Sequence, residues 1–318
     1  MNKALAFASI YHFEPSEDIL DVDFNGYRIL PIDIFKERYK EIVEVLIANN
    51  NWLVEPSIPA MECKYILVIT GNKDVDISQL MFKEVCYMFV NTLSYARLFK
   101  LGDIQLGTIF AILPNQVPHR VPYHTDFNCF MSNIPYINYT HKAQVYSLNK
   151  DEMKDLLCLT GRVENGPIKH INALLDTIAF LNKAKNTSDI SYKILNYVIF
   201  LERLLLGDNQ ELKFRLCIKL VLLLKDSTLR KFISDVYDMR SDIAHSGTVL
   251  GETFSKKYHE NHKQELSVEK VYEYINRLDN IARTVANIIL NKILADKNMN
   301  VNKVRENIDK EIFELLSK

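Results

Sequence analysis

The chain reads DSTLRKFISDVYDMRSDIAHSG from Asp226 to Gly247, and this stretch decides the architecture of its second half. Apolar side chains recur in it at helical spacing, which predicts an amphipathic helix with one buried face. Because glycine commonly ends a helix, we expect Gly247 to stop this one and His245 to lie in or just past its last turn. The expected buried face consists of Leu229, Phe232, Ile233, Val236 and Ile243.

The same periodicity continues on both sides of this helix. Residues 207–209 (Gly-Asp-Asn) and 225–227 (Lys-Asp-Ser) supply turn and N-cap residues between the periodic segments. Short connections between long helices predict an antiparallel bundle, and we expect the longer polar stretch 246–267 to interrupt it as a loop. The six expected helices are Ile168–Ala184, Ile190–Leu206, Glu211–Leu224, Leu229–Ala244, Val268–Ala295 and Val301–Leu316.

The first half of the chain has a different pattern. Apolar β-rich runs, bounded by Gly, Asn, Asp and Pro, alternate with helical patterns, which predicts an α+β domain. Gly and Pro residues between positions 160 and 167 mark a seam. We therefore expect an α+β domain at residues 1–160 and a helical bundle at residues 161–318. The expected strands are 4–10, 65–69 and 105–113, and the expected helices are 32–48 and 78–98, the latter with Ser78 as its N-cap.

Length and charge agree with this division. A chain of 318 residues exceeds the size at which a single core usually stops growing. Its 39 basic and 40 acidic side chains give a net charge of −1, which argues against a histone-like polycation. Residues 1–160 carry a net charge of −5 and residues 161–318 a net charge of +4. The second half is therefore the better candidate for contact with nucleic acid.

The sequence predicts no disulfide framework, metal site, cofactor site or membrane span. The five cysteines are scattered and form no Cys-x-x-Cys pair, which suits a reducing, cytoplasmic location. No apolar run is long enough to cross a membrane, and no P-loop or dinucleotide-binding glycine pattern is present. One set of residues in the first half has a spacing that matches no familiar metal site: His119, His124, Asp126, Cys129 and His141.

Arg240 and His245 are the candidate catalytic residues. On a helix of 3.6 residues per turn their side chains are rotated by about 140° from each other. The pair suits phosphodiester chemistry, because His can move the proton of an attacking hydroxyl while Arg stabilises charge on the phosphoryl oxygens. The alternative is structural: Arg240 would pair with Asp238 or Asp242, and the cations would complement the helix dipole.

The stretch Val236–Gly247 resembles the HEPN superfamily and, within it, the Apea-like branch. The hallmark of the superfamily is an Arg, four to six further residues, and a His at the end of a bundle helix. The segments FLERLLL at 200–206 and ELKFRL at 211–216 resemble the preceding helices of that branch, and the resemblance covers roughly residues 185–295. It implies a metal-independent endoribonuclease. The 2′-hydroxyl of RNA would attack the adjacent phosphorus and leave a 2′,3′-cyclic phosphate and a 5′-hydroxyl.

The resemblance also implies roles for individual residues. His245 would be the acid/base, and Arg240 the electrostatic stabiliser. Ser241 stands where the family often has a larger polar residue, so Ser241 and Asp242 would support the site. Two such motifs commonly face each other, which implies a homodimer through the C-terminal bundle.

The implied setting is prokaryotic anti-phage defence, such as abortive infection, or a toxin system. RNA would be the substrate, residues 1–160 a sensor or regulatory domain, and an antitoxin or phage-derived trigger a partner. The alternative is a non-catalytic HEPN module that binds RNA or dimerises, with an N-terminal domain that senses a ligand or protein.

Glu202 stands out as an acid within a strongly apolar helical segment. It either neutralises a cation close to it in the sequence or orients Arg240 or His245 from a facing helix. The neighbouring cations are Arg203, Arg215 and Lys219.

The polar stretch 246–267 carries several basic side chains, with Tyr258 among them. Such a stretch is either a solvated loop or a surface that guides RNA. The candidate RNA-binding residues are Lys256, Lys257, His259, His262 and Lys263.

Overall fold

The computed structural model separates into two compact units, of which the first ends at Gly161 and the second begins at Arg162. Strands and helices combine in the first unit, and the described part of the second is helical, so the expected α+β part followed by a helical part is confirmed. The structure describes residues 5–24, 26–48, 63–70, 82–100, 102, 104–112, 119–120, 145–164, 168–187, 189–206, 212–247, 252–296 and 298–317.

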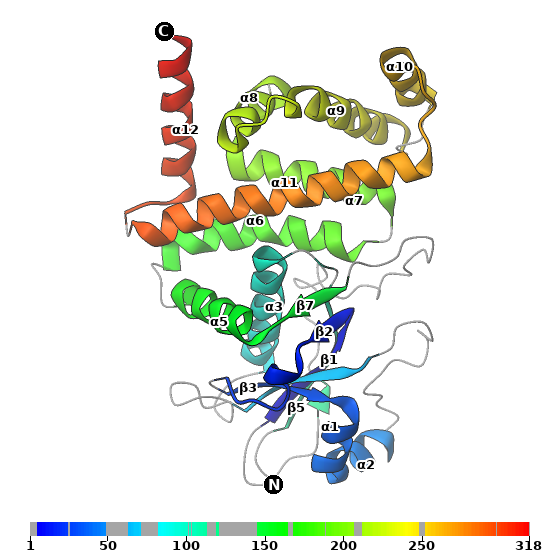
Figure 1. Cartoon of the computed structure of the whole chain (residues 1–318), viewed down its shortest axis with the longest axis vertical. Coiled ribbons are helices and arrows are strands. Elements are labelled where there is room, and N and C mark those ends of the chain that lie inside the picture. Colours follow the sequence, from blue (N-terminus) through cyan, green and yellow to red (C-terminus); the bar gives the residue numbers. More distant parts are fainter. Residues whose placement is uncertain are drawn as a thin grey trace. The chain divides into compact units, whose positions relative to one another are not determined.

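The first unit is built on a five-stranded antiparallel sheet in the order β3–β4–β1–β5–β6 (Figure 1). Every residue of the central strand β1 is buried, as expected for a strand whose sheet is covered on both faces. A separate parallel pair joins β2 to β7. The strands are β1 Leu5–Tyr11, β2 Phe13–Pro15, β3 Tyr27–Pro31, β4 Tyr65–Ile69, β5 Gln105–Ile112, β6 His119–Arg120 and β7 Tyr146–Leu148.

Helices cover this sheet. Phe7 of β1 packs against Phe35 and Phe110, with ring centroids 4.9 and 5.4 Å apart. The single helix expected over residues 32–48 is interrupted at Tyr39, whose ring packs against Phe35. Ser78, the expected N-cap of the next helix, lies outside the described residues. The helical elements are η1 Glu17–Ile19, α1 Ile32–Arg38, α2 Lys40–Ala48 and α3 Phe82–Phe99, which packs against β5.

Helix α5, Lys150–Glu164, crosses the expected seam. Thr160 and Gly161 therefore do not end the helix. A single glycine costs a helix only about 1 kcal/mol relative to alanine, and the Thr160 hydroxyl donates to the Leu156 carbonyl within the helix. The boundary between the units nevertheless falls directly after Gly161.

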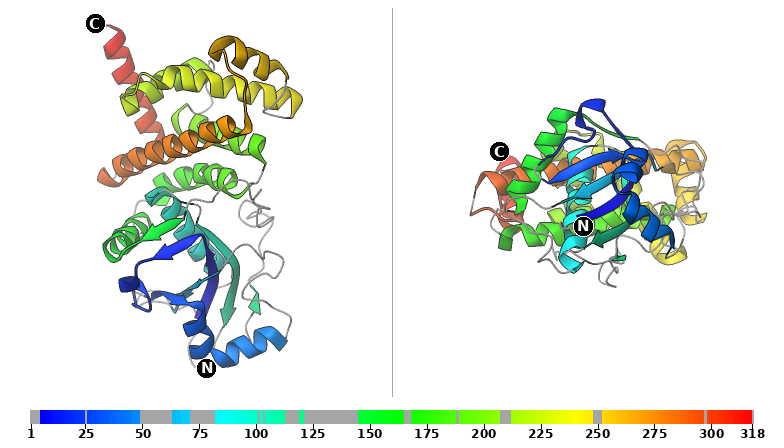
Figure 2. Two further views of the ribbon diagram at one scale, coloured as in Figure 1. Left: turned by 45° about the vertical axis from the view of Figure 1, so that its right-hand side comes forward. Right: turned by 90° about the horizontal axis from the view of Figure 1, so that it is seen from below.

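In the second unit α6, α7, α9 and α11 lie side by side, and α12 runs across them (Figure 2). Helix α7 packs against α6, α9 and α11, and α9 packs against α8 and α10. The six helices expected from periodicity are confirmed, with ends within two residues of those observed. The helices are α6 Ile168–Asn186, α7 Ile190–Leu205, α8 Leu212–Leu224, α9 Leu229–Ser246, α10 Glu252–His262, α11 Val268–Ala295 and α12 Val301–Leu316.

The expectation of a loop over residues 246–267 is wrong, because α10 occupies its centre. This helix buries Tyr258, which is 2% exposed, while Lys256 and His259 on either side of it are exposed. The sequence of this helix, ETFSKKYHENH, shows no apolar stripe, and polar composition alone does not separate it from a loop.

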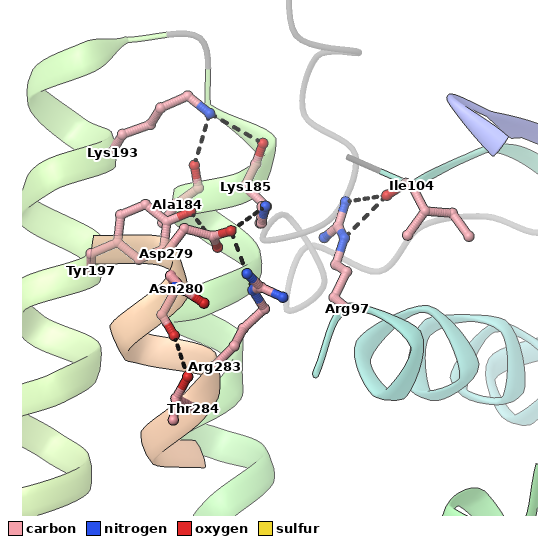
Figure 3. A network of polar contacts seen from close by, with 10 residues as sticks. All are labelled: Arg97, Ile104, Ala184, Lys185, Lys193, Tyr197, Asp279, Asn280, Arg283 and Thr284. Carbon is pink, nitrogen blue, oxygen red and sulfur yellow. Dashed lines mark hydrogen bonds and ion pairs between the residues drawn. The ribbon is translucent and has the colours of Figure 1, made fainter. Parts of the chain in front are cut away.

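A buried polar network ties α6, α7 and α11 together inside the bundle (Figure 3). The Asp279 carboxylate accepts from Lys185 Nζ at 2.9 Å, Tyr197 Oη at 2.9 Å and Arg283 Nε at 3.2 Å. Because a buried charge is stable only when it is paired and hydrogen-bonded, these contacts fix the register of the three helices. In the first unit, Arg97 is anchored in a similar way by two hydrogen bonds to the Ile104 carbonyl (Figure 3).

Across the described residues, every helix is too short or too polar to cross a lipid bilayer.

Candidate functional site

Helix α9 carries the candidate site and ends where the sequence predicted. Gly247 adopts a left-handed conformation, with φ of 76°, and its N–H donates to the Ile243 carbonyl at 2.8 Å. This arrangement closes the helix and leaves His245 exposed in the last turn. The expected buried face is confirmed: Leu229, Phe232, Ile233, Val236 and Ile243 are each at most 7% exposed.

Arg240 faces an acid from the neighbouring helix. Glu202 of α7 is 8% exposed, and its Oε1 accepts a hydrogen bond from Tyr237 Oη at 2.7 Å. Arg240 Nε lies 3.7 Å from the same oxygen. That nitrogen is buried and has no hydrogen-bond partner, while the Arg240 side chain as a whole keeps 34% of its exposure. One end of the guanidinium is therefore held by the bundle, and part of the side chain remains open to solvent.

Tyr237 keeps the Glu202 carboxylate in place. Burial disfavours the phenolate, and the hydrogen bond to Glu202 retains the proton, so the pKa of Tyr237 is raised far above its usual range. Tyr237 thus remains a hydrogen-bond donor to Glu202 at every physiological pH. Since Tyr237 and Arg240 are three residues apart on one helix face, a single carboxylate serves both.

The expected pairing of Glu202 with a cation close to it in the sequence is wrong. Arg203 lies over the Phe180 ring at 4.5 Å, and Arg215 and Lys219 reach Asp309 at 3.5 and 2.8 Å. Asp238, a possible partner of Arg240, pairs instead with Lys213 at 3.0 Å. The geometry agrees with the other hypothesis, in which Glu202 orients Arg240 from a facing helix.

The remaining residues of the motif differ in their access to solvent. Ser241 is exposed, whereas Asp242 is 7% exposed and belongs to the interior of the bundle. Arg240 and His245 are separated by a rise of about 7.5 Å along α9 as well as by the rotation of about 140°. The helix of one chain therefore presents the two side chains in different directions.

One of the candidate RNA-binding residues, His262, packs between neighbouring helices. The Nε2 atom of His262 lies 3.0 Å from Asp235 Oδ2, and its ring stacks on Tyr258 with centroids 4.3 Å apart. His262 is thus part of the packing of α10 onto α9, and the buried Tyr258 offers no face to a base.

The other basic residues of this segment differ in what the structure shows of them. Lys256, His259 and Lys263 are exposed, while the side chain of Lys257 lies outside the described residues.

Sequence reasoning missed the tyrosines that hold the buried carboxylates on each side of α9. Tyr237 donates to Glu202, and Tyr274 of α11 donates to Asp235 at 2.8 Å. One signal was available: Asp235, like Glu202, is an acid next to the apolar residues of its helix. An acid at such a position requires a donor, and a tyrosine at bundle spacing can supply one.

Within the described residues, no three His, Cys, Asp or Glu side chains come together in a way that could hold a metal ion. Of the histidine-rich set in the first half, only the backbone of His119 is described, and His124, Asp126, Cys129 and His141 lie outside the described residues.

The comparisons with known proteins assign no family, since no family model, curated protein or solved structure matches the chain.

Proposed function

We propose that the helical unit is a metal-independent endoribonuclease of the HEPN type. The proposal rests on one observation: an exposed histidine ends the helix on which an arginine is held by a buried carboxylate of the facing helix. His245 is exposed and therefore accessible to a substrate, and Glu202 limits the orientations of Arg240. Holding a cation in place before the substrate arrives is what electrostatic stabilisation of a transition state requires.

In the proposed reaction His245 accepts the proton of an RNA 2′-hydroxyl. The O2′–P bond forms as the P–O5′ bond breaks, and the departing O5′ receives a proton from protonated His245 of the same chain or of a second one. Arg240 stabilises the negative charge that accumulates on the phosphoryl oxygens. The products are a 2′,3′-cyclic phosphate and a 5′-hydroxyl. All the groups in this scheme belong to the protein or the RNA, so it needs no metal ion.

The proposed setting follows from the resemblance of residues 185–295 alone. It is cytoplasmic anti-phage defence or a toxin system in a prokaryote, with the chain acting as a homodimer. The first unit would serve as the sensor, and an antitoxin or a phage-derived trigger would be its partner.

Cleavage of bulk RNA by the full chain in excess EDTA tests the proposed activity. We expect fragments with 2′,3′-cyclic phosphate ends on a denaturing gel. We also expect no cut at a position where the sugar is 2′-deoxy, because the nucleophile is then missing. The matched control variant is Lys310→Gln, an exposed cation on α12, which should cleave like the unmodified chain. Cleavage that stops on addition of EDTA, or that proceeds at the 2′-deoxy position, contradicts the mechanism.

One observation favours a second candidate, a non-catalytic module that binds RNA or dimerises. Arg240 already has a structural partner in Glu202, so a role in the bundle would account for it without any substrate. In that case the full chain would retain labelled RNA in a filter-binding assay and leave it intact.

A further inference from the structure

A concave site lies on α9, away from Arg240 and His245. It is a hollow of about 460 Å³ between the first half of α9, the end of α10 and the first half of α11. This volume lies within the range of small-molecule sites, roughly 300–1,000 Å³. Lys231 at this hollow and His245 are about 21 Å apart along the helix. Six of the residues that line it carry the argument: Lys231, Asp235, His262, Lys270, Tyr274 and Arg277.

The inner part of the hollow is rigid and already hydrogen-bonded. Asp235, which is 5% exposed, accepts through one oxygen from Tyr274 Oη at 2.8 Å and lies 3.0 Å from His262 Nε2. Since an ionised carboxylate only accepts, the Nε2 atom carries a proton. The other ring nitrogen of His262 can then accept a hydrogen bond when the ring is neutral and donate one when it is protonated. Stacking on Tyr258 fixes the plane of the ring.

The outer part of the hollow carries three permanent cations. Arg277 lies over the Phe232 ring at 4.5 Å and 3.5 Å from Asp226, and both side chains of this ion pair are 42% exposed. Lys270 pairs with Glu273, which is also exposed. Among the described residues no carboxylate lies within ion-pair distance of Lys231, which is itself exposed.

These charges favour an anionic ligand. Exposed ion pairs contribute little to stability, so a ligand can replace the carboxylates that face Arg277 and Lys270. The buried Asp235 is already occupied by its two donors and repels an anion less than an unpaired carboxylate would. A guanidinium binds two oxygens of a phosphate at once, and an ammonium adds a point charge beside it.

We propose that this hollow binds a small phosphate-bearing molecule of nucleotide size. The phosphate would lie among Lys231, Lys270 and Arg277. The rest of the ligand would lie toward His262 and the stacked rings of Phe232 and Tyr274, whose centroids are 5.2 Å apart. This site is independent of the proposed cleavage chemistry, because it shares no residue with the Arg240–His245 motif.

Calorimetric titration of the full chain tests the proposal, with AMP, adenosine and inorganic phosphate as probes. We expect AMP to bind and adenosine not to bind at the same concentrations, with inorganic phosphate as a weaker competitor of AMP. Lys231→Gln removes an exposed side chain, so it should fold normally and weaken AMP binding about tenfold, the usual effect of one charge-assisted hydrogen bond. Lys310→Gln, the matched control on α12, should bind AMP like the unmodified chain.

Three results would overturn the proposal: no AMP binding at millimolar concentration, equal affinity for AMP and adenosine, or unchanged affinity in Lys231→Gln. A fourth is loss of RNA binding in Lys231→Gln without any AMP binding, which would assign the hollow to an RNA surface. His245→Ala separates this proposal from the cleavage mechanism, because it should leave AMP affinity unchanged whether or not the chain cleaves RNA.

Discussion

Among single side chains, the contact between α7 and α9 determines what Arg240 can do. Glu202 receives the hydroxyl of Tyr237 and lies beside Arg240 Nε, so one buried carboxylate orients two residues of α9. His245 differs from them in being exposed in the last turn of the helix. Substitution of His245 should therefore change activity alone, whereas substitution of Arg240 should change both activity and stability.

Replacing His245 should remove activity and leave the fold intact. We expect His245→Ala to lower the rate of RNA cleavage by about 10²–10⁴, the usual contribution of a general acid or base. Its midpoint temperature of thermal unfolding should stay within about a degree of that of the unmodified chain, because the side chain is exposed. Lys310→Gln, at an exposed cation of α12, is the control and should retain full cleavage. Wild-type cleavage by the His245→Ala protein would remove His245 from the mechanism.

Replacing Arg240 should affect both properties. Arg240→Ala leaves the Glu202 carboxylate buried without its cation, so we expect the free energy of unfolding in urea to fall by about 1–3 kcal/mol. We expect cleavage to fall by about 10²–10³. Arg240→Lys should recover part of the stability and little of the cleavage, since an ammonium does not reproduce the planar fork. Full cleavage by Arg240→Lys would show that only the charge matters.

At the scale of elements, α9 is fixed on two sides by bonds of the same kind. Tyr237 joins it to Glu202 of α7, and Tyr274 of α11 joins it to Asp235. In both cases the pKa of the tyrosine is raised far above its usual range. Burial is the larger cause, and the hydrogen bond to the carboxylate is the second. The folded chain therefore keeps two protons that the unfolded chain releases near its ordinary tyrosine pKa of about 10.

The sign of the resulting pH dependence follows from proton counting. Below about pH 10 both states hold these protons and the stabilisation is complete. Above it the unfolded state binds fewer protons, so the free energy of unfolding falls by up to about 1.4 kcal/mol per pH unit for each tyrosine. We expect Tyr237→Phe and Tyr274→Phe each to flatten this fall in urea titrations between pH 10 and 12. Tyr192→Phe, at an exposed position, should leave the slope unchanged; a flattening there would contradict the assignment.

The end of α9 depends on the conformation of Gly247. A Cβ at this position would meet nothing within 4 Å, so the effect of a substitution is that of the backbone alone. We expect Gly247→Ala to lower the free energy of unfolding by about 1–2 kcal/mol, the cost of a left-handed residue. Gly247→Asn should lower it less, since Asn tolerates this conformation.

Gly161 lies in helix α5, and a Cβ there would also meet nothing within 4 Å. Gly161→Ala should therefore have the opposite effect and raise the free energy of unfolding by about 0.5–1 kcal/mol. Equal effects at the two glycines, measured by urea unfolding, would contradict this account.

The helices of the bundle could be predicted because burial imposes a period on their sequences. Val268–Ala295 and Val301–Leu316 were predicted residue for residue. Helix α10 was missed because its sequence is mostly polar and shows no helical period of apolar residues. Glu202 could be singled out because an acid is rare on an apolar helix. Its partner could not, since the choice among Arg203, Arg215, Lys219 and Arg240 depends on how α7 and α9 are rotated against each other.

At the scale of the whole molecule, the arrangement of the motif bears on the assembly. Along α9 the side chains of Arg240 and His245 are rotated by about 140° and separated by a rise of about 7.5 Å, so one helix does not direct both at the same phosphate. In a dimer with a twofold axis, the same surface of each chain faces the other. Arg240 of one chain and His245 of the other can then approach one phosphate from opposite sides. The homodimer implied by the resemblance would serve this purpose.

The full chain should therefore be a dimer whose activity depends on assembly. We expect it to sediment at twice its chain mass of 37.0 kDa at about 10 µM. If the site is composite, cleavage per chain should fall on dilution in parallel with dissociation, because each monomer lacks part of the site. Sedimentation and cleavage should be measured over the same dilution series, with RNA in excess. The concentration at which half of the dimer has dissociated can then be compared with the concentration at which half of the cleavage per chain is lost. A monomer at 10 µM with constant cleavage per chain would show that a single Arg240–His245 pair is sufficient.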